Sequence, residues 1–446
     1  MHGADPVRSP LRTSPDHAHP ERQSAPPRPG EREAESVTRT SRPETRVTSD
    51  DAVTRDSAPR FVMALLKDME AHGASDMYLT AGYPPLFRVH GALRPFREEP
   101  LSPKEVAVIV RSVMNDRQRR EFDDTHECNF AIRPGDMGRY RVSAFVQQGV
   151  PGLVLRTIPT QIPSIGDLRV PELLERISLT KRGLIIMVGA TGSGKSTTLA
   201  AMVGYRNRAT QGHILTIEDP IEFVHTKHPG GCVVNQREIG ADTESWENAL
   251  KNSLRQAPDV IQIGEIRSRE TMEFAVQFAE TGHLCLSTLH ANNANQALDR
   301  IINLFPEERR GQVLLDLSFN LKAVISQRLI RTPDGQGRVP AVEVLLNTPH
   351  VADLIHQGRV GDLKEAMQKG RAQGMQTFDQ SLFDLYERGF ISEQDALANA
   401  DSENELRLQI KLRSRRRARS LEDEDLGGLS LAGSEREEQD TGAGAE

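Results

Sequence analysis

A glycine-rich segment, Gly189-Ala190-Thr191-Gly192-Ser193-Gly194-Lys195-Ser196, matches every fixed position of the phosphate-binding pattern G-x-x-x-x-G-K-[ST]. Its glycines let the backbone curl so that successive N–H groups point at a phosphate, and a following helix adds positive potential. Lys195 is placed to reach the β- and γ-phosphates, and the Ser196 hydroxyl to ligate Mg²⁺. The segment, with Thr197 after it, therefore predicts a nucleoside triphosphate site.

The residues on either side of this loop support the same interpretation. Residues 183–188 form a short apolar run rich in branched side chains, which predicts a buried strand entering the loop. Residues 197–202 favour the helix that leaves it. A strand, a glycine-rich loop and a helix in this order are the context that the phosphate-binding pattern requires.

Two acidic segments are candidates to order Mg²⁺ and to position an attacking water. The first, residues 216–222, ends a predicted strand and contains Glu218, Asp219 and Glu222. The second follows the apolar run 260–263 and ends in Gly264-Glu265, where an aspartate is more usual. Ligands bind at the carboxyl ends of parallel strands, so both segments are suitably placed. Spacing alone leaves open which acid of the first segment acts.

Several histidines and arginines are weaker candidates for residues that act at the phosphate site. His283 and His290 flank the apolar run 284–289, where a histidine can sense a γ-phosphate or orient an acid. The residues alone favour ordinary structural histidines. Arg139, Arg141 and Arg156 lie on predicted strands, and an arginine brought to a γ-phosphate from a neighbouring subunit would stabilise the transition state.

The pattern along the chain predicts five parts. Apolar runs alternate with helical stretches between residues 166 and 345, which predicts an α/β domain with a largely parallel sheet covered by helices on both faces. A small α+β domain precedes it, in which Ser102, Pro103 and Glu105 predict a capped helix start. The expected parts are a disordered extension (1–58), the small domain (59–165), the α/β core (166–345), a helical region (346–412) and a disordered charged tail (413–446).

Composition excludes several classes of protein. The chain has 446 residues and a net charge of −7, which disfavours a nucleic-acid binder held by a basic surface. No apolar run approaches the length of a membrane span, and the first residues lack the apolar core of a secretory signal, so we expect a cytoplasmic protein without a transmembrane segment. Cys128, Cys232 and Cys285 are far apart, which indicates buried free thiols.

Four segments together resemble one family. They are GATGSGKSTT (189–198), TIEDPIEF (216–223), IGEIRSRETM (263–272) and GHLCLSTLHANNANQALDRIINLFPEERR (282–310). The chain from about Phe61 to Lys411 resembles the type IV pilus retraction ATPases of the PilT/PilU type, within the secretion-type hexameric ATPases. The resemblance implies a PAS-like domain before a RecA-like P-loop domain, a ring of six subunits, ATP with Mg²⁺, and an inner-membrane pilus platform protein as partner.

The resemblance also implies roles for individual residues. Glu222 corresponds to the general base, and Glu265 to the Walker B glutamate that orders Mg²⁺ through water, together with Ser196. The histidine motif of the family is matched by His283 and His290. Arg141 and Arg156 match arginines of the N-terminal domain that complete the site, and Arg139 is a weaker candidate.

Three features distinguish subfamilies within this family. A tetracysteine insert, usual in pilus-assembly relatives, has no counterpart here, which favours retraction. Residues 291–297, Ala-Asn-Asn-Ala-Asn-Gln-Ala, look like PilU. In PilT a motif Ala-Ile-Arg-Asn-Leu-Ile-Arg is needed for retraction, but here residues 350–356 are His-Val-Ala-Asp-Leu-Ile-His.

Two further hypotheses stay open at this stage. PilU-type proteins resemble accessory motors that act with PilT, so the chain could be an adapter for PilT with weak ATPase activity. A RecA-like nucleic-acid motor is the other hypothesis, disfavoured by the acidic balance and by the lack of an aromatic and basic stacking pattern.

Overall fold

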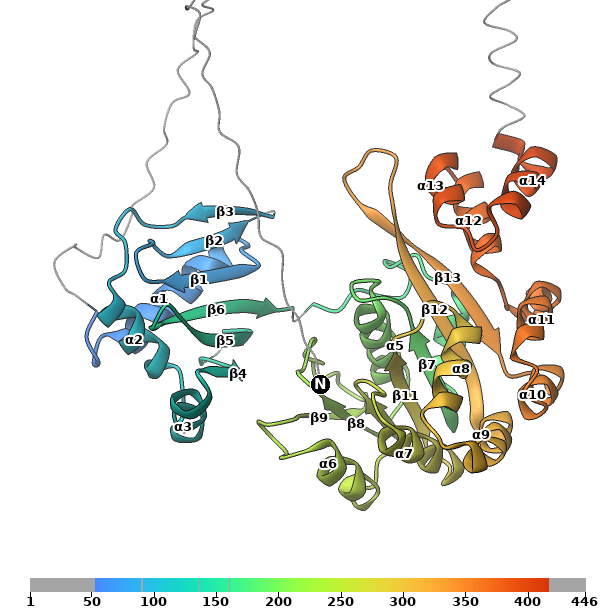
Figure 1. The fold of residues 1–446 in the computed structure, drawn as a ribbon, viewed down its shortest axis with the longest axis horizontal. Helices are drawn as coiled ribbons and strands as arrows, with labels where there is room; N and C mark the ends of the chain where they lie inside the picture. Colours follow the sequence, from blue (N-terminus) through green and yellow to red (C-terminus); the bar gives the residue numbers. More distant parts are fainter. Residues whose placement is uncertain (1–52, 90, 136, 160, 417–446) are drawn as a thin grey trace, which may run out of the picture. The chain divides into compact units, whose positions relative to one another are not determined.

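The computed structural model describes residues 53–89, 91–135, 137–159 and 161–416. Most of the predicted N-terminal extension and charged tail therefore lies outside the described residues. Along the described chain, a six-stranded sheet is followed by a seven-stranded sheet and then by a group of helices (Figure 1).

The N-terminal domain is built on an antiparallel sheet with the strand order β3-β2-β1-β6-β5-β4. Its strands are β1 (Asp76–Thr80), β2 (Leu86–Val89), β3 (Ala92–Pro95), β4 (Glu127–Ile132), β5 (Arg139–Gln147) and β6 (Val150–Ile158). Its helices are α1 (Ala58–Ala71), α2 (Pro103–Ser112) and α3 (Asp116–Thr125). The predicted small α+β domain is thus confirmed, but β3 and α3 were not foreseen. All four residues of β3 are exposed, so no apolar pattern marks that strand.

Local sequence explains why these helices form. In α1 the apolar residues Val62, Leu65, Leu66 and Met69 recur at helical spacing, and all four are buried against the sheet. At the start of α2 the backbone N–H of Glu105 donates to the Ser102 hydroxyl (3.3 Å), and the backbone N–H of Ser102 donates to the Glu105 carboxylate (2.8 Å). The predicted capping box is therefore present.

The second sheet carries the phosphate-binding loop and has the strand order β13-β12-β7-β11-β10-β8-β9. The strands are β7 (Gly183–Val188), β8 (His213–Glu218), β9 (Val233–Glu238), β10 (Val260–Ile263), β11 (Leu284–Leu289), β12 (Leu321–Arg331) and β13 (Arg338–Leu346). Every neighbouring pair is parallel except β12 and β13. This confirms the predicted largely parallel α/β domain, with one antiparallel strand at its edge.

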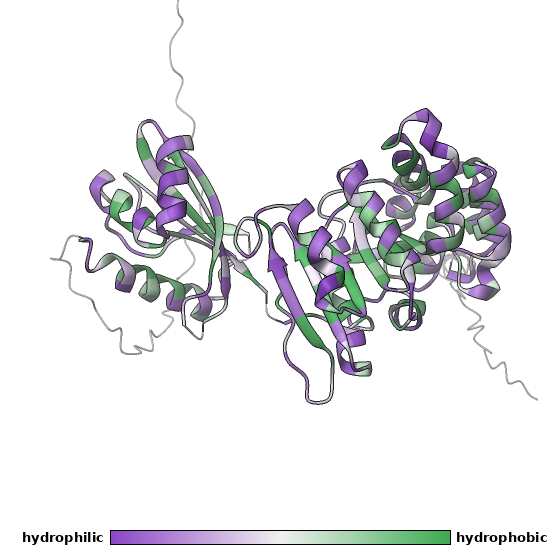
Figure 2. Cartoon of the chain, turned by 90° about the horizontal axis from the view of Figure 1, so that it is seen from below, coloured by the Kyte–Doolittle hydropathy of each residue, from purple (hydrophilic) through white to green (hydrophobic). Residues whose placement is uncertain are grey.

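Helices cover both faces of this sheet. The alternating side chains of β7 show the two layers, because Leu184, Ile186 and Val188 belong to one apolar cluster and Ile185 and Met187 to the other. The first cluster includes α6 (Trp246–Ser253), α7 (Arg269–Glu280), α8 (Ala294–Asn303) and α9 (Glu307–Asn320), and the second includes α4 (Leu173–Ser178) and α5 (Lys195–Ala209). In Figure 2 the strands at the centre of this domain are largely green, and the helices around them carry purple outer faces.

Two strands of this sheet, β9 and β12, were not foreseen from the sequence. Helix α9 ends at Asn320 and β12 begins at Leu321, so the two elements meet without a loop. Residues 312–331 contain no glycine or proline to mark that change. Strand β9 mixes polar and exposed residues, which hides it among loop sequences.

The C-terminal region consists of α10 (Pro349–His356), α11 (Leu363–Lys369), α12 (Phe378–Glu387), α13 (Glu393–Ala398) and α14 (Glu403–Arg413), with short 3₁₀ turns between them. Phe378, Leu382 and Leu406 form an apolar cluster with Ile330 of β12 and Val339 of β13. Helices α12 and α14 are therefore packed on the two strands at one edge of the sheet, whereas α10 and α11 belong to the apolar cluster that includes α9. No helix among the described residues has the length and apolar character needed to cross a membrane. All three cysteines are buried free thiols, as expected.

Candidate functional site

The phosphate-binding loop lies between β7 and α5 and adopts a conformation that only glycine accommodates easily. Gly192 and Gly194 have φ values of 78° and 86° in the left-handed region, and Gly194 caps α5. A Cβ atom on Gly189 would lie 2.5 Å from the Gln327 carbonyl oxygen, and one on Gly194 would lie 2.6 Å from the Gln327 side-chain nitrogen. The glycines of the pattern are thus required by backbone angle and by close packing.

Lys195, the first residue of α5, is buried within the loop. Its Nζ donates to the carbonyl oxygens of Gly189 (2.9 Å) and Ala190 (3.0 Å). Burial lowers the pKa of Lys195 below its ordinary value, and the nearby Glu265 and Glu222 carboxylates oppose this effect. A cation held beside backbone N–H groups at a helix N-terminus suits a polyphosphate.

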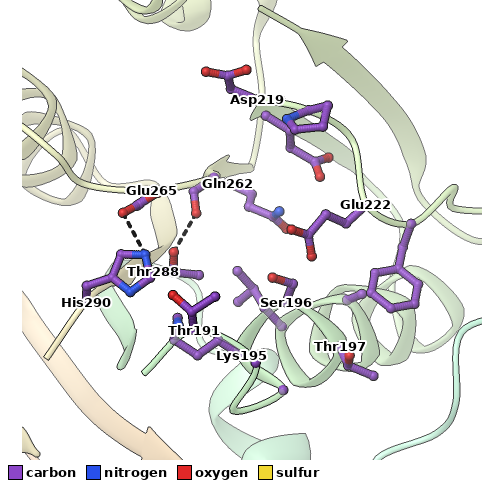
Figure 3. A pocket seen from close by; sticks show the side chains of 18 of the residues that line it. Thr191, Lys195, Ser196, Thr197, Asp219, Glu222, Gln262, Glu265, Thr288 and His290 are labelled. Carbon is purple, nitrogen blue, oxygen red and sulfur yellow. Dashed lines mark hydrogen bonds and ion pairs between the residues drawn. The ribbon is translucent and has the colours of Figure 1, made fainter. Parts of the chain in front are cut away.

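A cavity of about 590 Å³ opens over this loop at the carboxyl ends of the parallel strands. Figure 3 shows Thr191, Lys195, Ser196 and Thr197 on one side of the cavity and the acidic side chains on the other. Two buried polar atoms here, the Ser193 hydroxyl in the loop and the Gln262 Oε1 in the cavity wall, have no hydrogen-bond partner among the described residues. Such unpaired atoms, together with the glycine cradle and Lys195, fit a nucleotide with its Mg²⁺.

Glu265 lies directly beyond β10 and is held by two charged or ionisable neighbours. Its Oε1 lies 3.1 Å from His290 Nε2, and its Oε2 accepts a hydrogen bond from Arg267 Nε at 2.8 Å. The preceding Gly264 is fixed by Thr288, whose hydroxyl donates to its carbonyl oxygen at 2.7 Å. Strands β10 and β11 thus bring Glu265 and His290 together, as Figure 3 shows.

The acids at the end of β8 and just beyond it, Glu218, Asp219 and Glu222, have different surroundings. Glu218 is buried, and its Oε1 accepts hydrogen bonds from the Thr216 hydroxyl (2.6 Å) and from Gln236 Nε2 (3.1 Å). Burial raises the pKa of Glu218. Glu222 is exposed to the cavity and points toward Ser196, whereas Asp219 points away from the loop (Figure 3). Of the three, Glu222 has the geometry to act on a water at the phosphate end.

His225 is a residue of the cavity that the sequence did not single out. It lines the cavity together with Glu222, and its Nδ1 is buried without a partner among the described residues. Burial lowers the pKa of His225 to about 4, with a smaller contribution from His228. The ring is therefore neutral at physiological pH. A histidine in an otherwise unremarkable loop gives no local signal of this burial.

The remaining predicted site residues, three arginines and His283, differ in whether they reach the cavity. Arg141 of β5 lines the cavity. Arg156 does not line it; its Nε donates to the Asp76 carboxylate at 2.7 Å, and its side chain is 66% exposed. Arg139 pairs with Glu238 of β9 at 2.7 Å. His283 lies at the amino end of β11, where its Nδ1 is 3.0 Å from the Thr281 hydroxyl. The structure therefore brings His290 and Arg141 to the cavity but not Arg156, Arg139 or His283.

Comparison with known proteins gives a consistent result. The family described as type II/IV secretion system protein matches residues 51–420. The chain is 59% identical to "Type IV pilus ATPase PilU" of Pseudomonas aeruginosa over 337 residues, which cover 76% of this chain and 88% of that protein. It is 43% identical to the P. aeruginosa pilus retraction ATPase PilT over 339 residues, covering 76% of this chain and 98% of that protein.

A solved structure shares the fold. The pilus retraction motor PilT with bound ADP superposes with a TM-score of 0.72 and 38% identity, covering 77% of this chain and 98% of that one. At this identity and coverage, the likeness extends over both the N-terminal domain and the domain that carries the phosphate-binding loop.

Proposed function

Since the chain belongs to the type II/IV secretion system protein family, we propose that it is a PilU-like ATPase that powers or assists type IV pilus retraction. The observation that carries this proposal is the 59% identity to PilU over 88% of that protein. The cavity over the phosphate-binding loop agrees with it, because Lys195, Glu222 and Glu265 converge there. ATP hydrolysis is the activity, and pilus retraction is the work that it drives.

The cavity residues divide the chemistry of hydrolysis among them. Residues 189–197 hold the triphosphate, with Lys195 compensating negative charge on the β- and γ-phosphates. Ser196 and Glu265 would hold Mg²⁺, which when bound offsets the charge of the phosphate oxygens. His290, at 3.1 Å from Glu265, orients that carboxylate. Glu222, which points toward Ser196, acts as general base on the attacking water.

The proposed motor is an assembly of several copies of the chain. We place the chain in a ring of six, in which Arg141 faces the phosphates and adds positive charge to the transition state. Arg156 and His283 remain weaker members of this set, since neither lines the cavity in a single subunit. Hydrolysis would change the angle between the two domains and act on an inner-membrane platform protein at the cytoplasmic base of the pilus, beside a PilT-type motor.

A second candidate function is an adapter for PilT with weak ATPase activity. The observation that favours it is the segment His350–His356, which differs from the PilT motif and forms most of α10. Val351, Leu354 and Ile355 of that helix are buried, so the segment contributes to packing as well as to surface. The adapter function predicts that binding to PilT persists without ATP turnover.

The experiment that tests the proposal measures ATPase activity and pilus retraction with and without PilT. Lys195→Ala should abolish turnover by the purified ring, and Arg208→Ala, on an exposed position of the same helix, is the matched control. If Lys195→Ala supports normal retraction beside active PilT, the adapter function is favoured. If wild-type protein neither hydrolyses ATP nor alters retraction, the proposal fails.

A further inference from the structure

Strand β12 runs beside β7, the strand that leads into the phosphate-binding loop. Ser326 of β12 is level with Val188, the last residue of β7, so Gln327 stands next to Gly189, where the loop begins. On its other side β12 pairs with β13 along nine residues. Gln327 is therefore fixed within the sheet and lies directly beneath the loop.

The side chain of Gln327 is 3% exposed and makes two hydrogen bonds to the loop and its helix. Its Nε2 donates to the Ser193 carbonyl oxygen at 2.8 Å. Its Oε1 accepts from the hydroxyl of Thr198, a buried residue of α5, at 2.8 Å. A single buried amide thus joins the loop to the first turn of α5, in a place where water does not compete for these bonds.

Gln327 also limits the conformations that the loop can adopt. Its carbonyl oxygen packs against Gly189 and its side-chain nitrogen against Gly194, where a Cβ atom would come within 2.6 Å. Because the Ser193 carbonyl is held by Nε2, the peptide between Ser193 and Gly194 has a set orientation. In this trans peptide the Gly194 N–H points opposite to the Ser193 carbonyl, and therefore away from the Gln327 amide.

We propose that Gln327 is a positioning residue that keeps the phosphate-binding loop in its binding conformation without touching the nucleotide. The inference rests on the proposed nucleotide site. Without the Gln327 amide, the phosphate-binding loop would sample other conformations. Nucleotide binding would then be weakened by the free energy needed to order the loop. The effect should therefore appear in nucleotide affinity more than in the rate of the chemical step.

The test compares Gln327→Leu with Gln376→Leu in the full chain. Gln376 is a matched control because its Nε2 donates to the Val342 carbonyl of β13 at 2.7 Å, one strand farther from the loop than Gln327. We expect Gln327→Leu to weaken binding of a fluorescent ATP analogue and to raise KM about tenfold, with kcat changed less than threefold. Gln376→Leu should change both constants less than twofold, while both variants lower the melting temperature.

A double-mutant cycle with Thr198→Val tests whether the two side chains act together, and Thr198→Val by itself still tests the link if Gln327→Leu does not fold. Thr198→Val removes the donor to Gln327 Oε1 and should raise KM a few-fold. The double variant should be no worse than Gln327→Leu alone, because both substitutions break the same link. Fully additive effects, or nucleotide binding by Gln327→Leu within twofold of wild type, would overturn the proposal.

Lys195→Ala, measured in parallel, separates this inference from the site on which it rests. If Lys195→Ala loses nucleotide binding while Gln327→Leu keeps it, the site stands and the positioning role is wrong. If Lys195→Ala binds as tightly as wild type, the nucleotide site itself is wrong, and the role of Gln327 falls with it.

Discussion

The parallel strands of the seven-stranded sheet end at a carboxyl edge and begin at an amino edge. The two edges carry the same types of polar residue, but these residues have different roles. At the carboxyl edge, Glu265 and His290 face a cavity, and nearby polar atoms of Ser193, His225 and Gln262 are buried without partners among the described residues. At the amino edge, the side chains of His213, Asp259 and His283 are each paired with neighbours. Chemistry is placed at the first edge because loops and the N-terminus of α5 converge there.

At the amino edge, aspartate and histidine side chains stabilise the fold by hydrogen bonds to neighbouring residues. Asp259, before β10, accepts a hydrogen bond from the backbone N–H of His213 at 2.8 Å. The His213 ring lies 3.0 Å from the Gln256 carbonyl oxygen, and the His283 ring lies 3.0 Å from the Thr281 hydroxyl. These contacts close loops, and none of these residues lines the nucleotide cavity.

Replacing an acid at the carboxyl edge should have the largest effect. Glu222→Ala is expected to lower kcat by about 10²–10⁴-fold, the usual contribution of a general base. Binding of an ATP analogue should change little, because Glu222 is not part of the phosphate-binding loop. Steady-state ATPase assays and equilibrium binding with the purified protein measure the two quantities.

The isosteric variant Glu222→Gln is the control, because it keeps the shape but removes the base. It should lose turnover as Glu222→Ala does. If either variant loses nucleotide binding together with turnover, Glu222 has a folding role and the contrast between the two edges weakens.

His225, whose Nδ1 is buried, should make the free energy of unfolding depend on pH. Its folded pKa of about 4 lies below the unfolded value of 6.5, so the unfolded chain binds more protons between these values. The free energy of unfolding should therefore fall as pH decreases from about 6.5 to 4, by at most about 3 kcal/mol from this residue. Denaturant unfolding at several pH values measures the slope.

The matched comparison for this pH dependence is His225→Asn against His283→Asn. The first should reduce the slope between pH 4 and 6.5, and the second should leave it close to wild type. Equal slopes in wild type and His225→Asn would show that His225 is not held neutral by burial.

His283 and His290 lie at opposite ends of β11, a six-residue strand of about 20 Å. Replacing each one therefore compares the effect of a histidine at the amino edge with that of one at the carboxyl edge. His290→Ala removes the partner of Glu265 and should lower kcat about tenfold, equivalent to about 1.4 kcal/mol of transition-state stabilisation. His283→Ala should change kcat less than twofold. A large loss with His283→Ala would mean that His283 of a neighbouring subunit reaches the site in the proposed ring.

The smallest expected effect concerns Asp259. Asp259→Ala removes one hydrogen bond to the His213 backbone and should lower the free energy of unfolding by about 1 kcal/mol. ATPase kinetics should be unchanged, because Asp259 does not line the cavity. Unfolding curves and turnover measured on the same preparation test both parts, and an altered kcat would contradict the division between the edges.

Much of the fold was predictable because its signals are local. The apolar runs of β7, β8, β10 and β11 and the helical spacing of α1 are legible from neighbouring residues. The strand β12 was not predictable, since residues 312–331 contain no loop signal between helix and strand. Strand β3 was missed because its side chains are all exposed.

The phosphate-binding loop could be recognised before the fold was known, because one continuous stretch of backbone supplies the glycines, Lys195 and Ser196. The distant side chains that join the loop depend on how the chain folds. Glu222 points toward Ser196, whereas Glu218 is held by Thr216 and Gln236. His290 meets Glu265, whereas His283 lies beside Thr281. Strand order and register set these outcomes, and they also place Gln327 beneath the loop. Such pairings depend on packing between segments far apart in the chain, which no local pattern records.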